Sequence, residues 1–470
     1  MTPNQYTPEE PISSIATALS PAALGIVRVS GKNCIELVSK VFSRPKALLE
    51  TKGNSLIYGW IENSADEKID EVMLGVYRAP KSFTGEDMVE IYCHGGPAVV
   101  TAIQNLMLKS GFRQANRGEY TFRAYINGKT DLTKAEAVKE IIDSHTDVSR
   151  SHAAGRLSGE LFNQIDSIKK LIIDTLAAIE VEIEYPEDEE TIADTFDRAD
   201  IETAITKLQN LVDSWKGEKL YQDGARVVLA GKTNAGKSSL FNAILKEERA
   251  IVSDIEGTTR DWLESWASIN GIPVRLFDTA GFRQTSDIIE AKGVELSKNL
   301  ANDADLVLYL VDSTAGLSED DKEFVCHCKE PLIIVFNKAD KTDEKQKNKN
   351  SSTLNELLQK TKINQTPVAF ICAKNGDGLK ELFEKMSKIL TSGLSTEREQ
   401  AGLGSARQKE SVQEALNCTK HALVSADDNY TLDAVVQDLE DALDALGEVT
   451  GDVTPDDVLG SIFANFCVGK

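Results

Sequence analysis

The feature that most constrains the fold is the octapeptide at residues 231–238, which reads Gly-Lys-Thr-Asn-Ala-Gly-Lys-Ser. An apolar run at 226–230 precedes it, and a helical pattern begins at Ser239. This order of strand, glycine-rich loop and helix is typical of the phosphate loop of a doubly wound α/β domain. Its glycines let backbone N–H groups turn inward around a phosphate. We expect the Lys237 ammonium to reach the β- and γ-phosphates and the Ser238 hydroxyl to ligate magnesium.

Three further motifs follow apolar runs in the same part of the chain, at residues 278–281 (Asp-Thr-Ala-Gly), 337–340 (Asn-Lys-Ala-Asp) and 372–374 (Cys-Ala-Lys). We expect Asp278 to hold magnesium through water and the Gly281 amide to sense the γ-phosphate. The Asp340 carboxylate can accept two hydrogen bonds that guanine donates and adenine does not, so such a site rejects the wrong base roughly 10⁴-fold or more. Each motif alone is also compatible with an ordinary strand-to-helix turn. Four in order predict a GTP site.

A polar loop at residues 253–261 lies between the first two motifs. Thr258 and Thr259 are expected to close over the γ-phosphate and its magnesium. Phe282 stands where small signalling GTPases place a glutamine that orients the attacking water. A phenyl ring cannot do this, so another group must position the water.

Together the motifs give one set of candidate residues. Lys237 and Asp278 are the catalytic candidates within them, and Ser238 and Thr259 are the magnesium ligands. The predicted GTP-binding residues are Asn234, Ala235, Gly236, Lys237, Ser238, Ser239, Ser253, Asp254, Ile255, Glu256, Gly257, Thr258, Thr259, Asp278, Thr279, Ala280, Gly281, Asn337, Lys338, Asp340, Cys372, Ala373 and Lys374.

Composition narrows the class of protein. The 470 residues are 41% hydrophobic and 27% charged, with no run apolar enough for a membrane span and no targeting segment, so we expect a cytoplasmic protein without a membrane partner. The net charge of −23 repels polyanions, so any RNA must be held by a local basic patch or a partner protein. Residues 341–350, rich in Lys and Asn, are predicted to be a solvated loop, with a weak RNA contact as the alternative. The seven scattered cysteines indicate reduced thiols rather than a metal site at 326–328.

The chain divides into four stretches by pattern. Residues 1–128 alternate β-prone runs with helical stretches, which predicts an α+β domain, and 223–390 predict the inserted Ras-like P-loop domain with a mostly parallel sheet. Residues 129–222 and 391–470 are helical. In the first of these, apolar residues from Leu157 to Ile183 recur at spacings of three and four. Since each helical piece is a poor core alone, we expect both to pack into one bundle.

Five further motifs carry a resemblance. They are Gly-Ile-Val-Arg-Val-Ser-Gly at 25–31, Ser-Phe-Thr-Gly-Glu-Asp at 82–87, His-Gly-Gly-Pro at 94–97, Arg-Gly-Glu-Tyr at 117–120 and Phe-Cys-Val-Gly-Lys at 466–470. With the motifs above, they make essentially the whole chain similar to the MnmE (TrmE) family of bacterial tRNA-modifying GTPases.

The resemblance implies a potassium-stimulated GTPase. In this family two G domains of a homodimer meet across their switch regions, with potassium where other GTPases receive an arginine finger. The matching ligands here are Asn234, Ser253, Ile255 and Thr258, and Ser253 stands where threonine is expected. The water-orienting glutamate maps to Glu290, which without the resemblance reads as a solvated helix charge.

The resemblance also implies an N-terminal domain that binds one-carbon tetrahydrofolate, such as 5-formyltetrahydrofolate, and mediates dimerisation. Its folate contacts map to Arg28, Glu90, Lys129 and Lys470, for which ordinary surface charges are the alternative. Cys467, in the Cys-x-Gly-Lys motif, is a candidate nucleophile or equally a packed thiol.

The family's reaction uses an FAD-containing partner, MnmG (GidA), in a heterotetramer or larger complex. It adds a carboxymethylaminomethyl or aminomethyl group to carbon 5 of the wobble uridine in certain tRNAs. Two other functions remain open: a ribosome-assembly GTPase, for which no basic Gly-x-x-Gly module is evident, and a scaffold that uses GTP only to dimerise.

Overall fold

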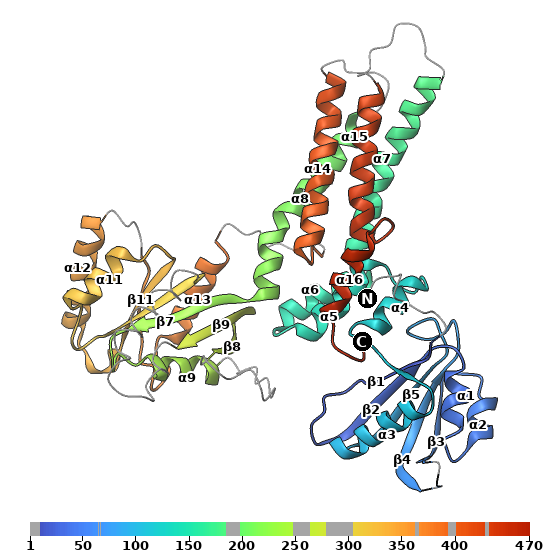
Figure 1. The fold of residues 1–470 in the computed structure, drawn as a ribbon. Helices are drawn as coiled ribbons and strands as arrows, with labels where there is room; N and C mark the ends of the chain where they lie inside the picture. Colours follow the sequence, from blue (N-terminus) through green and yellow to red (C-terminus); the bar gives the residue numbers. More distant parts are fainter. Residues whose placement is uncertain are drawn as a thin grey trace. The chain divides into compact units, whose positions relative to one another are not determined.

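The computed structural model describes residues 10–63, 65, 67–184, 198–247, 264–278, 304–361, 366–392, 401–427 and 432–470. The chain forms two compact units (Figure 1). Unit 1 comprises Met1–Lys139, Arg156–Gln209 and Ala406–Lys470, and unit 2 comprises Glu140–Gly155 and Asn210–Ser405. In the part of the chain that is described, no helix combines the length and the apolar character needed to span a bilayer.

The N-terminal part of unit 1 is a mixed sheet with helices on one face. Its order is β3-β4-β5-β2-β1-β6. The strands are β1 (Ile12–Ile15), β2 (Ala22–Ser30), β3 (Ser55–Glu62), β4 (Lys68–Tyr77), β5 (Met88–Gly95) and β6 (Arg113–Gln114). Apolar residues of one face form a core with α1 (Cys34–Ser39), α2 (Pro45–Glu50) and α3 (Pro97–Lys109). Because side chains alternate along a strand, Arg28 and Glu90 lie on the other face.

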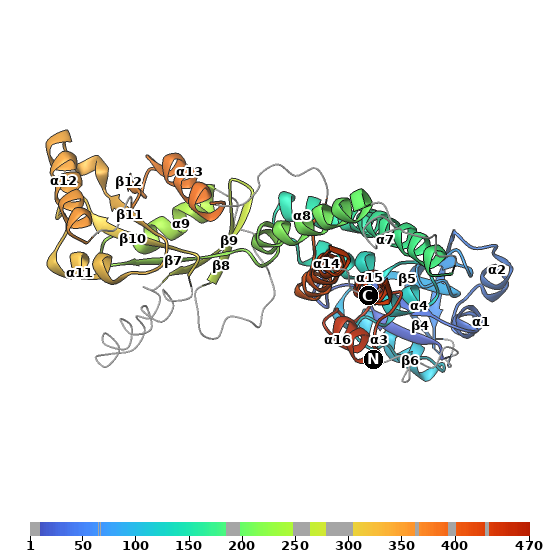
Figure 2. The ribbon, with the colours of Figure 1, turned by 90° about the horizontal axis from the view of Figure 1, so that it is seen from above.

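The remainder of unit 1 is helical. It contains α4 (Glu119–Ile126), α7 (Glu160–Glu184), α14 (Ala406–Asp427), α15 (Leu432–Thr450), α16 (Asp456–Ala464) and the first residues of α8 (Arg198–Asp223). Within it α15 packs against both α14 and α7 (Figures 1 and 2).

The predicted apolar stripe of α7 is shorter than expected. Ile165, Ile172 and Ile179 are buried, but Leu157 and Ile183 at its two ends are exposed. Gly159, at φ +98°, separates α7 from α6 (Asp147–Ser158), so Leu157 belongs to a different helix.

Unit 2 is built on a second sheet, of order β12-β11-β10-β7-β9-β8. The strands are β7 (Ala225–Gly231), β8 (Glu264–Ile269), β9 (Ile272–Asp278), β10 (Leu306–Asp312), β11 (Leu332–Asn337) and β12 (Val368–Phe370). Among the strand pairs that the structure describes in this sheet, β8–β9 is antiparallel and the others are parallel. Helices α9 (Lys237–Glu247) and α13 (Leu379–Leu390) share a core with one face, and α11 (Glu319–His327) and α12 (Glu344–Thr361) with the other. The predicted fold class, with a doubly wound and mostly parallel sheet, is confirmed.

One local prediction is wrong. Most of residues 341–350 form the start of α12 and not a loop. The Asp343 side chain accepts a hydrogen bond from the Gln346 N–H at 2.9 Å and so caps the first turn. The Lys, Glu and Gln residues of this segment also have good intrinsic helix propensity.

Candidate functional site

The phosphate loop joins β7 to α9 in unit 2. Gly231 has φ +130°, and a Cβ there would lie 2.3 Å from the Leu310 carbonyl oxygen. Gly236 has φ +101°, and its Cβ would lie 2.0 Å from Asn337 Nδ2. Neither position can hold a side chain without displacing its neighbour, so these glycines are required by the turn and by the close packing around it.

Lys237 and Ser238 occupy the first turn of α9, two residues earlier than the sequence pattern suggested. The Lys237 ammonium donates to the carbonyls of Gly231 (2.7 Å) and Lys232 (3.0 Å). The Ser238 hydroxyl donates to Asp278 Oδ2 at 3.0 Å. Hydroxyl and carboxylate oxygens are the kind of ligand that Mg²⁺ prefers, and these two lie side by side, so Ser238 and Asp278 fit a magnesium site.

The guanine side of the site is tied to the phosphate loop by Asn337. Its Nδ2 donates to the Ala235 carbonyl at 2.9 Å, and its Oδ1 accepts the Ala373 N–H at 3.0 Å. Lys338 Nζ donates to the Asn234 carbonyl at 2.9 Å. Asp340 follows β11 and is exposed. With the Ser238–Asp278 bond, the structure therefore brings together residues of all four predicted motifs, and it leaves the base-reading carboxylate accessible.

One residue of this site was missed by the sequence analysis. Asp312, at the carboxyl end of β10, accepts a hydrogen bond from Lys338 Nζ at 2.6 Å and another from the Thr314 hydroxyl. Burial alone would raise the pKa of Asp312, but the bonds from Lys338 and Thr314 outweigh it and hold that pKa below its usual value. The available signal was an acidic residue that ends a buried strand of a parallel sheet.

The remaining predicted nucleotide residues lie outside the described residues. These are Ser253, Asp254, Ile255, Glu256, Gly257, Thr258, Thr259, Thr279, Ala280, Gly281 and Glu290. Of the predicted potassium ligands, only Asn234 is described, with an exposed side chain and φ 64°.

A second cluster lies in unit 1, on the face of the N-terminal sheet opposite α1, α2 and α3. Arg28 Nη2 and Nε donate to Glu90 Oε1 at 2.6 and 2.9 Å. Arg28 Nη1 donates to the Gly469 carbonyl at 2.9 Å, and its guanidinium lies 5.9 Å from the ring centroid of Phe83. Burial, and next the Arg28 charge, lower the pKa of Lys470. Three of the four predicted folate residues are thus neighbours.

The other two candidate residues here have distinct surroundings. Lys129 Nζ donates to the Pro80 carbonyl at 3.0 Å, and its stem packs near Gly85. The Cys467 thiol is exposed, while its carbonyl accepts the Gly118 N–H at 3.4 Å.

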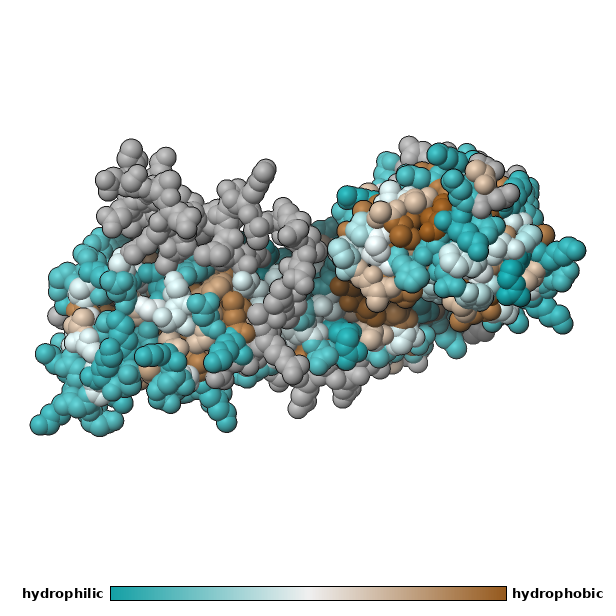
Figure 3. All heavy atoms as spheres, turned by 90° about the horizontal axis from the view of Figure 1, so that it is seen from below, coloured by the Kyte–Doolittle hydropathy of each residue, from teal (hydrophilic) through white to brown (hydrophobic). Residues whose placement is uncertain are grey.

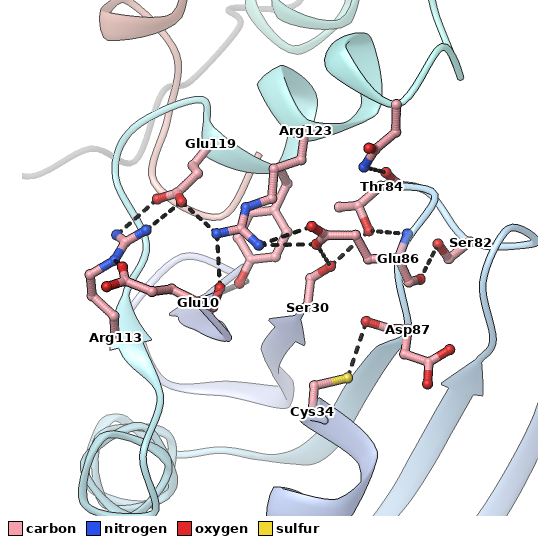
Figure 4. A network of polar contacts seen from close by, with 12 residues as sticks. Glu10, Ser30, Cys34, Ser82, Thr84, Glu86, Asp87, Arg113, Glu119 and Arg123 are labelled. Atoms are coloured by element: carbon pink, nitrogen blue, oxygen red, sulfur yellow. Dashed lines mark hydrogen bonds and ion pairs between the residues drawn. The ribbon is translucent and has the colours of Figure 1, made fainter. Parts of the chain in front are cut away.

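A buried ion network supports the 82–87 loop beside this cluster (Figure 4). The fully buried Arg123 guanidinium bridges Glu86 (3.0 Å) and the equally buried Glu119 (2.9 Å). Arg113 adds a second cation to Glu119 at 2.6 Å. Burial alone would raise the pKa of Glu119, but Arg113 and Arg123 lower it. Since Phe83 and Glu86 belong to one loop, the network fixes the loop whose ring contacts Arg28.

A strand, a glycine loop and a helix bring Lys237 and Ser238 close to Asp278. The segment 337–340 lies beside this loop, because Asn337 bonds the Ala235 carbonyl. This arrangement defines a P-loop guanine-nucleotide-binding protein. Two family descriptions match this chain: "GTP-binding protein TrmE N-terminus" over residues 11–129 and "MnmE helical domain" over residues 132–467. The chain belongs to the MnmE (TrmE) family.

Individual relatives agree with this assignment. The tRNA modification GTPase MnmE of Treponema denticola is 52% identical, covering 99% of both chains. That of Carboxydothermus hydrogenoformans is 42% identical over 98% of this chain and 100% of its own, and that of Treponema pallidum (strain Nichols) is 40% identical over 100% of both. Among solved structures, Era in complex with MgGDPNP and nucleotides 1506–1542 of 16S ribosomal RNA aligns at 28% identity over 41% of this chain and 66% of its own, with a TM-score of 0.30.

Proposed function

We propose that this chain binds and hydrolyses GTP and couples hydrolysis to the modification of tRNA. Family membership supports the proposal, since the relatives named above are tRNA modification GTPases. The observation that carries it is the bridge from Asn337 to both Ala235 and Ala373, which holds the phosphate loop against the base-reading segment. This preorganisation lowers the cost of binding a guanine nucleotide.

The proposed reaction is the addition of a carboxymethylaminomethyl or aminomethyl group to carbon 5 of the wobble uridine. An FAD-containing partner, MnmG, takes part, and a one-carbon tetrahydrofolate supplies the carbon. The neighbouring cations of Arg28 and Lys470 suit the glutamyl carboxylates of a folate, and Glu90 suits the donors of its pterin. This work takes place in the cytoplasm.

We further propose that the chain is a homodimer. Leu56, Tyr58 and Met73 are 63%, 49% and 37% exposed. By strand register they share the sheet face that carries Arg28 and Glu90. Figure 3 shows apolar patches on the surface of this part of unit 1. Exposed apolar surface of this kind marks an interaction site, and a second copy of the same face would cover it.

In the proposed hydrolysis step, Lys237 would neutralise the phosphates, together with a magnesium ion that Ser238 and Thr259 would hold. Asn234, Ser253, Ile255 and Thr258 would hold a potassium ion, which would supply positive charge near the β–γ bridge, and Glu290 would orient the water. Glu290→Ala should retain GTP binding and lose nearly all turnover. Equal turnover in sodium and potassium buffers would reject the role of the alkali cation.

The decisive experiment is mass spectrometry of tRNA after reaction with the chain, the flavoprotein partner, GTP, potassium, a one-carbon tetrahydrofolate and an amine, ammonia or glycine, that supplies the nitrogen. The modified wobble nucleoside is expected only in the complete mixture. Asp278→Asn, which should block hydrolysis, should also block modification. Modification at the full rate by this variant, or an unchanged wobble nucleoside in cells that lack the protein, would reject the proposal.

A further inference from the structure

A short segment of the helical region belongs to the nucleotide-binding unit. Glu140–Gly155, the end of α5 (Leu132–Asp143) and most of α6, is part of unit 2, whereas the residues on either side of it belong to unit 1. Among the contacts that join it to the rest of unit 2, His152 Nδ1 lies 2.9 Å from Glu218 Oε2 on α8, and the rings of His145 and Trp266 stack with centroids 3.9 Å apart at an interplanar angle of 27°. A stack this close depends on the exact position of the strand that carries Trp266.

Trp266 lies on β8 and is held from several sides. Its register partner on β9, Arg275, has its guanidinium 5.5 Å from the ring centroid. Gly224, at φ +70°, packs against the ring so closely that a Cβ would lie 2.4 Å from it. At the turn of the same hairpin, a Cβ on Gly271 would lie 2.9 Å from a methyl group of Val148. The β8–β9 hairpin therefore meets the 140–155 segment at two points.

The other end of the hairpin lies at the phosphate site. Asp278, the last residue of β9, accepts the hydrogen bond from Ser238. The first residue of β8, Glu264, follows the predicted γ-phosphate contact Thr259 by five positions in the chain. A shift of either strand end on nucleotide exchange would be carried along the paired strands, because the β8–β9 ladder is continuous from Glu264 to Ile269.

Helix α5 connects this contact with the other candidate site. Its C-terminal end, Asp143, is two residues before His145. At its N-terminal end, Leu132 and Ala135 share a core with Phe463 and Phe466. Phe466 directly precedes the segment in which the Gly469 carbonyl accepts the Arg28 guanidinium. One continuous helix thus starts at the support of the one-carbon site and ends beside the hairpin.

We propose that the His145–Trp266 stack is the contact through which the nucleotide state of the phosphate site is transmitted along α5 to the Arg28–Glu90–Lys470 cluster. The inference rests on the proposed function, because it takes GTP as the nucleotide and the cluster as the site of modification. Trp266 and His145 are positioning residues and contact no phosphate. The alternative is that the stack only tethers the segment, in which case its loss would loosen α5 equally in every nucleotide state.

Hydrogen–deuterium exchange of the full chain distinguishes transmission of the nucleotide state from simple tethering of the segment. Peptides that cover residues 129–155 are compared with GDP bound and with GDP and aluminium fluoride in potassium buffer. In the unmodified protein we expect exchange in these peptides to differ several-fold between the two states. His145→Ala should abolish the difference, and His145→Phe, which keeps an aromatic ring in the stack, should restore much of it. GTP turnover should stay within about twofold in both variants, because His145 contacts no phosphate. Loss of a catalytic contact would lower turnover much more than that.

The matched control is His327→Ala, which removes an exposed histidine of α11 in the same unit. It should leave the nucleotide-dependent difference intact. A full difference in His145→Ala, or exchange raised equally in both states, would overturn the inference while nucleotide binding and turnover still support the proposed function. Failure of the unmodified protein to bind GDP, measured in the same samples, would instead reject the proposed function and the inference with it.

Discussion

The Asn337 side-chain amide donates a hydrogen bond of 2.9 Å to the backbone carbonyl of Ala235 and so joins the base-reading strand end to the phosphate loop. Asn337 is 3% exposed, and its second bond, from the Ala373 N–H, is also buried. Both partners are backbone groups, so the bridge depends on the Asn337 side chain and not on the side chains of Ala235 or Ala373. The bridge therefore positions the phosphate loop relative to the segment that carries Asp340.

Asn337→Ala should weaken binding of both GDP and GTP. Two hydrogen bonds of about 1 kcal/mol each correspond to roughly a 30-fold higher Kd. Titration with a fluorescent guanine nucleotide measures the effect, and Asn417→Ala on α14 in unit 1 serves as a control that should bind normally. A Kd unchanged in Asn337→Ala would show that the bridge does not organise the site.

Asp340→Asn should change the base that is accepted. The exposed carboxylate can take two hydrogen bonds from guanine, and an amide cannot, so GTP affinity should fall by about 10³-fold or more. Xanthine presents an acceptor where guanine has its amino group, so xanthosine triphosphate should bind the variant better than GTP does. Competition titrations of the two nucleotides measure this, with Asp343→Asn as the control, because an Asn there still caps α12. An unaltered preference for GTP would place base recognition elsewhere.

The sequence predicted the parts of the fold and site that local chemistry determines. Gly231 and Gly236 mark the phosphate loop because their backbone conformations exclude other residues. The apolar runs before Asp278 and Asn337 predict buried strands of a parallel sheet, and the structure has such strands there. The N-terminal folate residues came from family resemblance, since Arg28, Glu90 and Lys470 are far apart in the chain and carry no local signal.

What could not be predicted depends on pairs that only the tertiary structure creates. Asp312 pairs with Lys338, and His145 stacks on Trp266, across large sequence separations. A histidine after a helix has no periodicity that would indicate its partner. The helix at 344–361 could not be predicted for a different reason: its first turns carry Lys and Asn in place of an apolar stripe, and the clearest local helix signal there is the cap at Asp343.

Arg123→Ala should destabilise unit 1. The substitution leaves the buried Glu119 carboxylate with Arg113 as a cation and removes the pair to Glu86. Breaking a buried ion pair from one side costs about 3–5 kcal/mol. The pKa of Glu119 is lowered in the native protein. The ion pairs of Glu119 therefore stabilise the fold fully at pH values above the ordinary pKa of a carboxyl group, and this stabilisation is lost as the pH falls through the pKa of Glu119 in the folded protein.

Calorimetry of the full chain should therefore show a lower first unfolding temperature in Arg123→Ala at neutral pH, with the deficit shrinking in acid. Arg198→Ala is the matched control, because its ion pair with Asp427 is at the surface and should contribute at most about 1 kcal/mol. Equal transitions in Arg123→Ala and the unmodified protein would show that the network does not support the fold.

Lys470 should give folate binding an alkaline limit. Burial and the Arg28 charge lower its pKa, against an opposing effect of Glu90, so its ammonium is lost at a pH below 10.5. A folate carboxylate binds the ammonium and not the neutral amine. Affinity for 5-formyltetrahydrofolate should therefore fall as pH rises toward 10.5, and Lys470→Arg, which stays protonated, should retain affinity over the same range.

Fluorescence titration from about pH 7 to 10.5 measures the folate affinity of the unmodified protein and of Lys470→Arg. The ligand's own titration affects each protein alike, so the difference between the two pH profiles reports on Lys470. Lys68→Arg, an exposed change on β4, should follow the unmodified protein. Parallel pH profiles for Lys470→Arg and the unmodified chain would remove Lys470 from the binding site.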